Sequence, residues 1–209
     1  MKSTSSTAAS DSPALDHAVP AAPPWAPASP AGLVAVAAAT SGLFALLGGH
    51  VGPGGLPLLG CWLLGGFVIQ LVTAILELKS GNLLGGNTFL FLGGFMMLTG
   101  GIEMIMTFNI VAGGGAPDGH LDGYIWAALS LVLWLWTPAY FTPFSLLSVI
   151  FALLDVALPV MALVDLGILP GEFMQISAWA FLAVALVAAY FSAAIVVNTV
   201  RGKKFYPMP

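Results

Sequence analysis

The sequence predicts an all-α integral membrane protein with six transmembrane helices and both termini in the cytoplasm. The 209 residues are 59 % hydrophobic and 7 % charged, whereas a soluble domain carries about 25 % charged residues. The apolar region from Gly32 to Asn198 has room for about six helices of roughly 20 residues with short loops. Six helices would also place all five Lys and Arg residues on one side of the membrane.

Three segments follow from the composition. Residues 1–29 are rich in Ala, Pro and Ser, cannot bury a core and are expected to be disordered. They do not look like a signal peptide, because Lys2 is followed by a polar, proline-rich tract. Residues 30–201 form the transmembrane domain, and residues 202–209 form a short basic tail.

Breaks rich in Gly, Pro or polar residues separate the apolar runs and define the spans. The expected spans are Gly32–Gly48, Leu58–Leu78, Thr88–Val111, Tyr124–Tyr140, Phe144–Val164 and Phe173–Val200. Paired glycines in the second and third runs allow close helix contacts, either around a pore or between subunits.

The basic residues orient the protein. With six spans, both tails and the loop after the second span lie on the same side, and that side carries Lys2, Lys79, Arg201, Lys203 and Lys204. The opposite loops carry Asp118, Asp122, Asp165 and Glu172, but no Lys or Arg. By the positive-inside rule, both termini are expected to be cytoplasmic.

Several other functions and ligands are disfavoured. The single cysteine, Cys61, rules out an intrachain disulfide and any multi-cysteine metal site. Without a basic stripe, nucleic acid is not an expected partner. The Asp118-x-His120-x-Asp122 pattern is better explained as a solvated loop beside three glycines than as a metal site. We therefore expect no metal and no cofactor; the lipid bilayer is the partner that the composition requires.

The stretch from Gln70 to Asn87 begins in an apolar run and ends in a glycine-asparagine break. In one interpretation, Glu77 and Lys79 simply flank a helix end where both reach water. In the other, Glu77 caps or pairs within the break and fixes its backbone, while Asn82 and Asn87 offer amide donors to a carboxylate solute. Gln70 and Thr40 either line the same path or bond their own helix backbone.

Two acids interrupt the third and fifth spans. An acid at mid-membrane costs on the order of 3 kcal/mol, so it needs a partner or a water-filled path. Glu103 and Asp155 are therefore candidates for coupling proton entry to solute movement. The alternative is a neutral, hydrogen-bonded acid at a subunit contact, or Glu103 lying near the outer interface.

The stretch Gln70 to Phe95 resembles the acetate uptake transporter family, which contains bacterial succinate–acetate permeases and yeast acetate/ammonia exporters. The similarity is concentrated in Leu76-Glu77-Leu78-Lys79-Ser80-Gly81-Asn82-Leu83-Leu84-Gly85 and continues without a gap to Gly93 and Phe95. Phe151-Ala-Leu-Leu154 also aligns, as do the span order and the basic end of the last helix.

The resemblance implies a path through each protomer of a hexamer, but the sequence departs from the family pattern. The family signature Asn-Pro-Ala-Pro-Leu-Gly-Leu is here Pro27-Ala-Ser-Pro-Ala-Gly-Leu33, so its asparagine is missing. The family's pore constriction of phenylalanine, tyrosine and leucine falls at Val36, Leu92 and Leu147. The constriction is therefore expected to stay apolar, without aromatic rings.

The leading hypothesis is a multi-pass channel or transporter of the cell membrane for small monocarboxylates, acetate first, with proton coupling as an option. Its expected path is lined by Val36, Thr40, Gln70, Glu77, Asn82, Asn87, Leu92 and Leu147. A pore for a neutral solute such as ammonia or urea is the main alternative, because an apolar constriction suits it equally well. A membrane aspartyl hydrolase ranks last, because its usual sequence pairs are absent; we expect no enzyme. A non-transporting scaffold stays open.

Overall fold

The structure is a computed structural model that describes residues 25–208. Most of the tail predicted to be disordered, residues 1–24, and the last residue lie outside the described residues. The described part of the chain consists of helices and connecting turns and contains no strand, which confirms the predicted all-α class.

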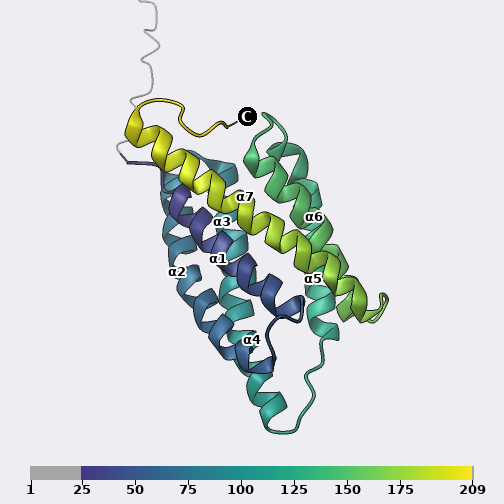
Figure 1. The fold of residues 1–209 in the computed structure, drawn as a ribbon. Coiled ribbons are helices and arrows are strands. Elements are labelled where there is room, and N and C mark those ends of the chain that lie inside the picture. The colour runs from purple at the N-terminus through teal and green to yellow at the C-terminus, as the bar shows by residue number, and fades with distance from the viewer. Residues whose placement is uncertain (1–24, 209) are drawn as a thin grey trace, which may run out of the picture.

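Six long helical segments form an elongated bundle (Figure 1). They are α1 (Ser29–Leu47), α2 (Leu56–Lys79), the continuous segment Leu83–Ala112, α5 (His120–Tyr140), α6 (Leu146–Asp165) and α7 (Met174–Arg201). The continuous segment consists of α3 (Leu83–Phe91), π-helical turns η2 (Leu92–Thr99) and α4 (Gly100–Ala112). Two 3-10 turns, η1 (Pro53–Gly55) and η3 (Gly171–Phe173), lead into α2 and α7.

Five of the six segments are long and apolar enough to cross a membrane, so the chain is a multi-pass membrane protein. The exception is α5, which begins with His120 and Asp122 and carries three tryptophans. These residues lower its mean hydropathy although its 21 residues match the length of a span. The six-helix prediction is confirmed; that α5 crosses the bilayer stays a prediction.

Two predicted helix starts are wrong by about one turn. The third segment begins at Leu83 rather than Thr88, because the Asn82 side chain caps it by accepting the Gly85 N–H at 2.9 Å. The helix α5 begins at His120 rather than Tyr124, and the Asp118 carboxylate accepts the His120 N–H at 3.1 Å. The second correction moves Asp122 from a loop into a helix.

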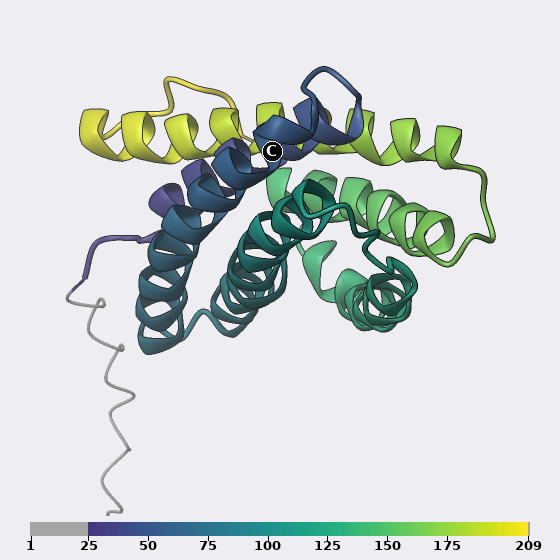
Figure 2. The ribbon, with the colours of Figure 1, turned by 90° about the horizontal axis from the view of Figure 1, so that it is seen from below.

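The helices pack in a continuous series. In Figure 2, α7 lies along one side of the bundle next to α1 and α6. The helix α2 packs against α1, α3 and α4, while α5 packs against α6. Helices α2 and α4 approach closely at two glycines, since a Cβ atom on Gly60 would lie 2.7 Å from the Gly101 carbonyl oxygen. These glycines therefore hold α2 and α4 together inside one subunit.

Helices α1 and α7 run antiparallel, so the N-terminus of α1 and the C-terminus of α7 lie at the same end of the bundle. Ser192 near the end of α7 donates to the Pro30 carbonyl at 2.9 Å, and Gln175 near its start donates to the Leu47 carbonyl at 3.5 Å. We call the end with Ser29, the α2–α3 turn and the end of α7 the basic end. We call the end with Pro117–Asp122 and Asp165–Glu172 the acidic end. On which side of the membrane each end lies stays a prediction.

Candidate functional site: two cavities and the buried segment between them

At the basic end, a buried carboxylate ties three helix ends together. Glu77, 6 % exposed near the end of α2, accepts the Ser29 backbone N–H at 2.8 Å and the Asn82 side-chain amide at 2.6 Å. Between these helices, Gly81 turns the chain with φ +85°, a conformation that glycine adopts without strain. Glu77 thus pairs within the glycine-asparagine break and fixes its backbone, one of its two predicted roles.

The two asparagines predicted to bind a carboxylate solute already form hydrogen bonds within the protein. The Asn82 amide donates to Glu77, and its oxygen caps α3. The Asn87 amide donates to the Leu83 carbonyl of its own helix at 2.8 Å, and its side chain lies in a surface groove between α3 and α5. Each amide has one further N–H, so their predicted contact with solute stays a prediction.

A cavity of about 110 Å³ lies beside this cluster. Helices α1, α3, α6 and α7 line it through Ser29, Leu33, Asn82, Gly85, Thr88, Phe89, Leu147 and Phe191. Of the three residues expected at the pore constriction, Leu147 alone is among these lining residues. We call this space the inner cavity. At its edge Thr88 accepts a hydrogen bond from Tyr140 at 2.7 Å, because the Thr88 hydroxyl proton is directed to the Leu84 carbonyl.

Two residues of the predicted path, Val36 and Leu92, lie in the hydrophobic core. They are 2 % and 3 % exposed. Thr40 donates to the Val36 carbonyl of its own helix at 2.8 Å. That these residues line a solute path stays a prediction.

Gln70 is a residue of the predicted path that reaches from α2 to α1. It is fully buried, and its amide donates to the Gly32 carbonyl on α1 at 3.0 Å. Its side-chain oxygen is buried without a partner among the described residues. It packs against the π-helical turns, where a Cβ atom on Gly93 would lie 2.9 Å from the Gln70 Cβ. Gln70 therefore offers an unused acceptor inside the bundle.

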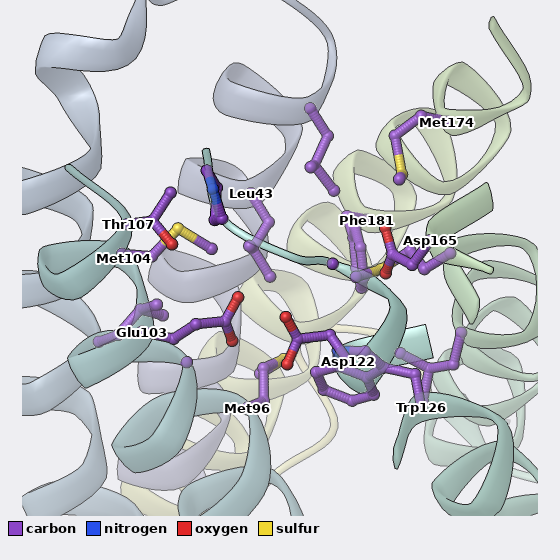
Figure 3. A pocket seen from close by; sticks show the side chains of 17 residues that line it. Leu43, Met96, Glu103, Met104, Thr107, Asp122, Trp126, Asp165, Met174 and Phe181 are labelled. Carbon is purple, nitrogen blue, oxygen red and sulfur yellow. The ribbon is translucent and has the colours of Figure 1, made fainter. Parts of the chain in front are cut away.

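The acidic end contains a larger cavity of about 300 Å³, which we call the outer cavity. Glu103 from α4, Asp122 from α5 and Asp165 from α6 all line it (Figure 3). The Glu103 and Asp122 carboxyl groups point toward one another across this space, while Met96, Trp126 and Phe181 supply apolar walls. The described residues around this cavity include no Lys, Arg or His. The arrangement suits groups that share or exchange protons.

Of these three acids, the sequence predicts Glu103 alone as a candidate site residue. Glu103 interrupts an apolar run and is therefore a candidate from the sequence, whereas Asp122 and Asp165 lie in predicted loops. In the structure Asp122 lies in the first turn of α5 and Asp165 is the last residue of α6. The single available signal was that both acids directly flank long apolar runs.

Asp155 does not join Glu103. Its carboxyl oxygen lies 2.6 Å from the Thr137 hydroxyl at the α5–α6 contact, and that hydroxyl also lies 3.0 Å from the Leu133 carbonyl. The Thr137 hydroxyl is thus placed to donate either to the Asp155 carboxyl group or to the Leu133 carbonyl. The other carboxyl oxygen of Asp155 is buried without a partner in the described chain.

The predicted solvated loop carries one exposed pair. Asp118 and His120 are 82 % and 66 % exposed and lie 2.8 Å apart. The backbone N–H of His120, and then its ring, hold the pKa of Asp118 below its ordinary value. Within residues 25–208, no group of three or more His, Cys, Asp or Glu side chains is arranged to hold a metal ion.

Comparison with known proteins gives a structural likeness and no sequence match. No family model and no curated protein sequence matches the chain. The fold is similar to the solved structure of the bacterial acetate channel SatP, with a TM-score of 0.72 and 18 % sequence identity. The similarity covers 88 % of this chain and 99 % of that one. The resemblance expected from the sequence is thus confirmed at the level of the fold.

Proposed function

We propose that this protein is a channel or transporter for small monocarboxylates, with acetate as the first candidate, and a divergent member of the acetate uptake transporter family. The observation that carries the proposal is the similarity to the bacterial acetate channel SatP over 88 % of the chain. The stretch Leu76–Gly85 supports it independently, because it resembles the family motif and forms the Glu77 cluster beside the inner cavity.

The two cavities support a path through one subunit. The inner cavity adjoins the basic end and the outer cavity adjoins the acidic end, with Val36 and Leu92 buried in the core. An anion entering the outer cavity would meet Glu103, Asp122 and Asp165. A protonated, neutral acid avoids that repulsion and crosses an apolar segment at lower cost. The substrate form that we propose is therefore the neutral acid, with Glu103 able to take part in proton exchange.

The test is labelled-acetate uptake into proteoliposomes of the purified full-length protein, with and without an inward proton gradient. Empty liposomes are the control, because acetic acid crosses bilayers unaided. We expect protein-dependent uptake that rises with the gradient and falls in Glu103→Gln. Asp155 does not line the outer cavity, so Asp155→Asn should leave uptake unchanged. Absence of protein-dependent uptake in folded protein would reject the proposal, and unchanged flux in Glu103→Gln would reject the role of Glu103.

A pore for a neutral solute such as ammonia or urea is the second candidate. The buried apolar segment at Val36 and Leu92 favours it, because such a segment passes small neutral molecules without a binding site. Flux of ammonia or urea that excess acetate does not inhibit, together with no protein-dependent acetate uptake, would select this candidate. We rank an aspartyl hydrolase below both, because Glu103 lines the outer cavity while Asp155 contacts Thr137.

We also propose that the protein forms a homohexamer in the cell membrane, as the family resemblance implies. Large apolar side chains are exposed along α2, including Trp62, Val68 and Val72, and can face lipid or another subunit. Light scattering of the protein in nanodiscs measures the number of subunits. A monomer in native lipid would reject the hexamer without bearing on transport.

A further inference from the structure

The C-terminal segment Gly202–Met208, which we call the strap, carries the densest positive charge in the described chain. Arg201 and, within the strap, Lys203 and Lys204 are all exposed. Lys79, the remaining basic residue in the described range, lies at the same end. None of these cations forms an ion pair within residues 25–208. Because Glu77 is buried and hydrogen-bonded to neutral groups, the exposed charges that residues 25–208 place at this end are positive.

The strap folds back on α7 and is held there by that helix. Gly202 ends α7 in a left-handed conformation with φ +60°, which reverses the chain. The Asn198 side chain then accepts the N–H groups of Phe205 and Tyr206 at 2.7 and 2.9 Å, and donates to the Tyr206 carbonyl at 2.9 Å. Tyr190, two turns earlier on α7, donates to the Pro207 carbonyl at 2.7 Å.

Aromatic rings are placed among these charges. The Arg201 guanidinium lies 4.6 Å from the centre of the Phe205 ring, and this ring is 52 % exposed. The Tyr206 ring packs edge-on against Tyr190 with their centres 5.8 Å apart. Lys204 donates to the Met208 carbonyl at 2.8 Å and remains exposed. Aromatic rings beside Lys and Arg at the end of a span suit the headgroup region of a bilayer.

We propose that the strap is a docking surface for anionic phospholipid headgroups. Its two lysines and the adjacent Arg201 at the end of α7 complement the negative charge of a phosphodiester surface, and each basic residue at such a surface strengthens binding. The strap follows directly on α7, a candidate membrane span, so its charges lie where headgroups lie. Asn198 and Tyr190 act as positioning residues, because they hold Phe205–Pro207 against α7 and so fix the segment that carries Lys203 and Lys204. The proposal does not depend on which solute the protein carries.

The experiment measures lipid retention by the purified full-length protein, using native mass spectrometry with phosphatidylglycerol and phosphatidylcholine of the same acyl chains. We expect preferential retention of phosphatidylglycerol that weakens with added salt. The combined variant Arg201→Gln, Lys203→Gln, Lys204→Gln should lose this preference by about fivefold for each charge removed. Equal retention of both lipids by the unaltered protein would overturn the proposal.

Two matched variants test whether the lipid preference depends on the strap or on any positive charge at this end. Lys79→Gln removes a cation at the same end but outside the strap and should keep the preference; an equal loss there would overturn the assignment to the strap. Asn198→Ala changes no charge, and its side-chain partners all lie in the strap, so the bundle should fold while the preference falls. Full retention in Asn198→Ala would overturn its positioning role.

A final arm distinguishes the lipid from free phosphate. Inorganic phosphate in large excess carries the same chemical group without a membrane surface. We expect it to leave phosphatidylglycerol retention nearly unchanged beyond its effect as a salt, matched with chloride at equal ionic strength. Displacement by phosphate but not by chloride would show a phosphate site rather than a lipid surface and would overturn the proposal.

Discussion

The two ends of the bundle use their acidic side chains in opposite ways. At the basic end, Glu77 is buried and its oxygens are bonded to Ser29 and Asn82. At the acidic end, Glu103, Asp122 and Asp165 line a cavity of about 300 Å³, and two of them face one another. The first arrangement fixes the backbone of the α2–α3 turn, and the second gathers carboxyl groups around a cavity. A carboxylate in a membrane protein is therefore interpretable only from its partners.

The sharpest test of this contrast is Glu77→Ala. It leaves the Ser29 N–H and the Asn82 amide without their acceptor, and it should lower the free energy of unfolding by about 3 kcal/mol. Thermal or denaturant unfolding in detergent measures the loss. Lys79→Ala is the matched control, because this exposed neighbour forms no ion pair in the described chain and should change stability by less than about 0.5 kcal/mol. Similar stability of the two variants would contradict the role assigned to Glu77.

A smaller loss of stability is expected when either asparagine is replaced. Comparing this loss with acetate uptake distinguishes a structural role from contact with solute. Asn82→Ala removes the cap of α3 and one donor to Glu77, which should cost about 1 kcal/mol. Asn87→Ala removes a bond to a carbonyl of its own helix and should cost much less. If Asn87→Ala slows acetate uptake at unchanged stability, its predicted contact with solute gains support. Equal stability losses would count against the cap.

Neutralising an acid at the acidic end should raise the free energy of unfolding rather than lower it. Glu103→Gln removes an acid whose ionised form would repel the facing Asp122 carboxylate, so we expect stability at neutral pH to rise by about 0.5 kcal/mol rather than fall. The gain should disappear as the pH is lowered and the carboxyl groups of the unaltered protein become protonated. Unfolding measured in parallel at neutral and acidic pH gives both quantities. A loss comparable to that of Glu77→Ala would erase the distinction between the two ends.

The sequence predicted the helices better than the acid cluster, for a physical reason. Long apolar runs and the grouping of Lys and Arg depend on neighbours in the chain, so six helices and the basic end were predictable. The role of Glu77 was also within reach, because Asn82 follows it by five residues. Glu103, Asp122 and Asp165 come from three helices, and their convergence depends on how α4, α5 and α6 pack. The start of α5 was missed because glycines surround the Asp118 turn that begins it.

The smallest effect is expected at the exposed pair of the acidic end. His120 lowers the pKa of Asp118, mainly through its backbone N–H and then through its ring. Because its pKa is lower in the folded state, Asp118 stabilises the folded protein at pH values above the ordinary pKa of aspartate. This contribution is lost as the pH falls through the pKa of Asp118 in the folded state. Because both side chains are exposed, solvent screens the pair, and His120→Ala should leave the unfolding temperature unchanged. Carboxyl NMR should still show the pKa of Asp118 rising part of the way toward its ordinary value, since the backbone N–H remains. A clear fall in unfolding temperature would mean that this loop, like the Glu77 cluster, holds helices together.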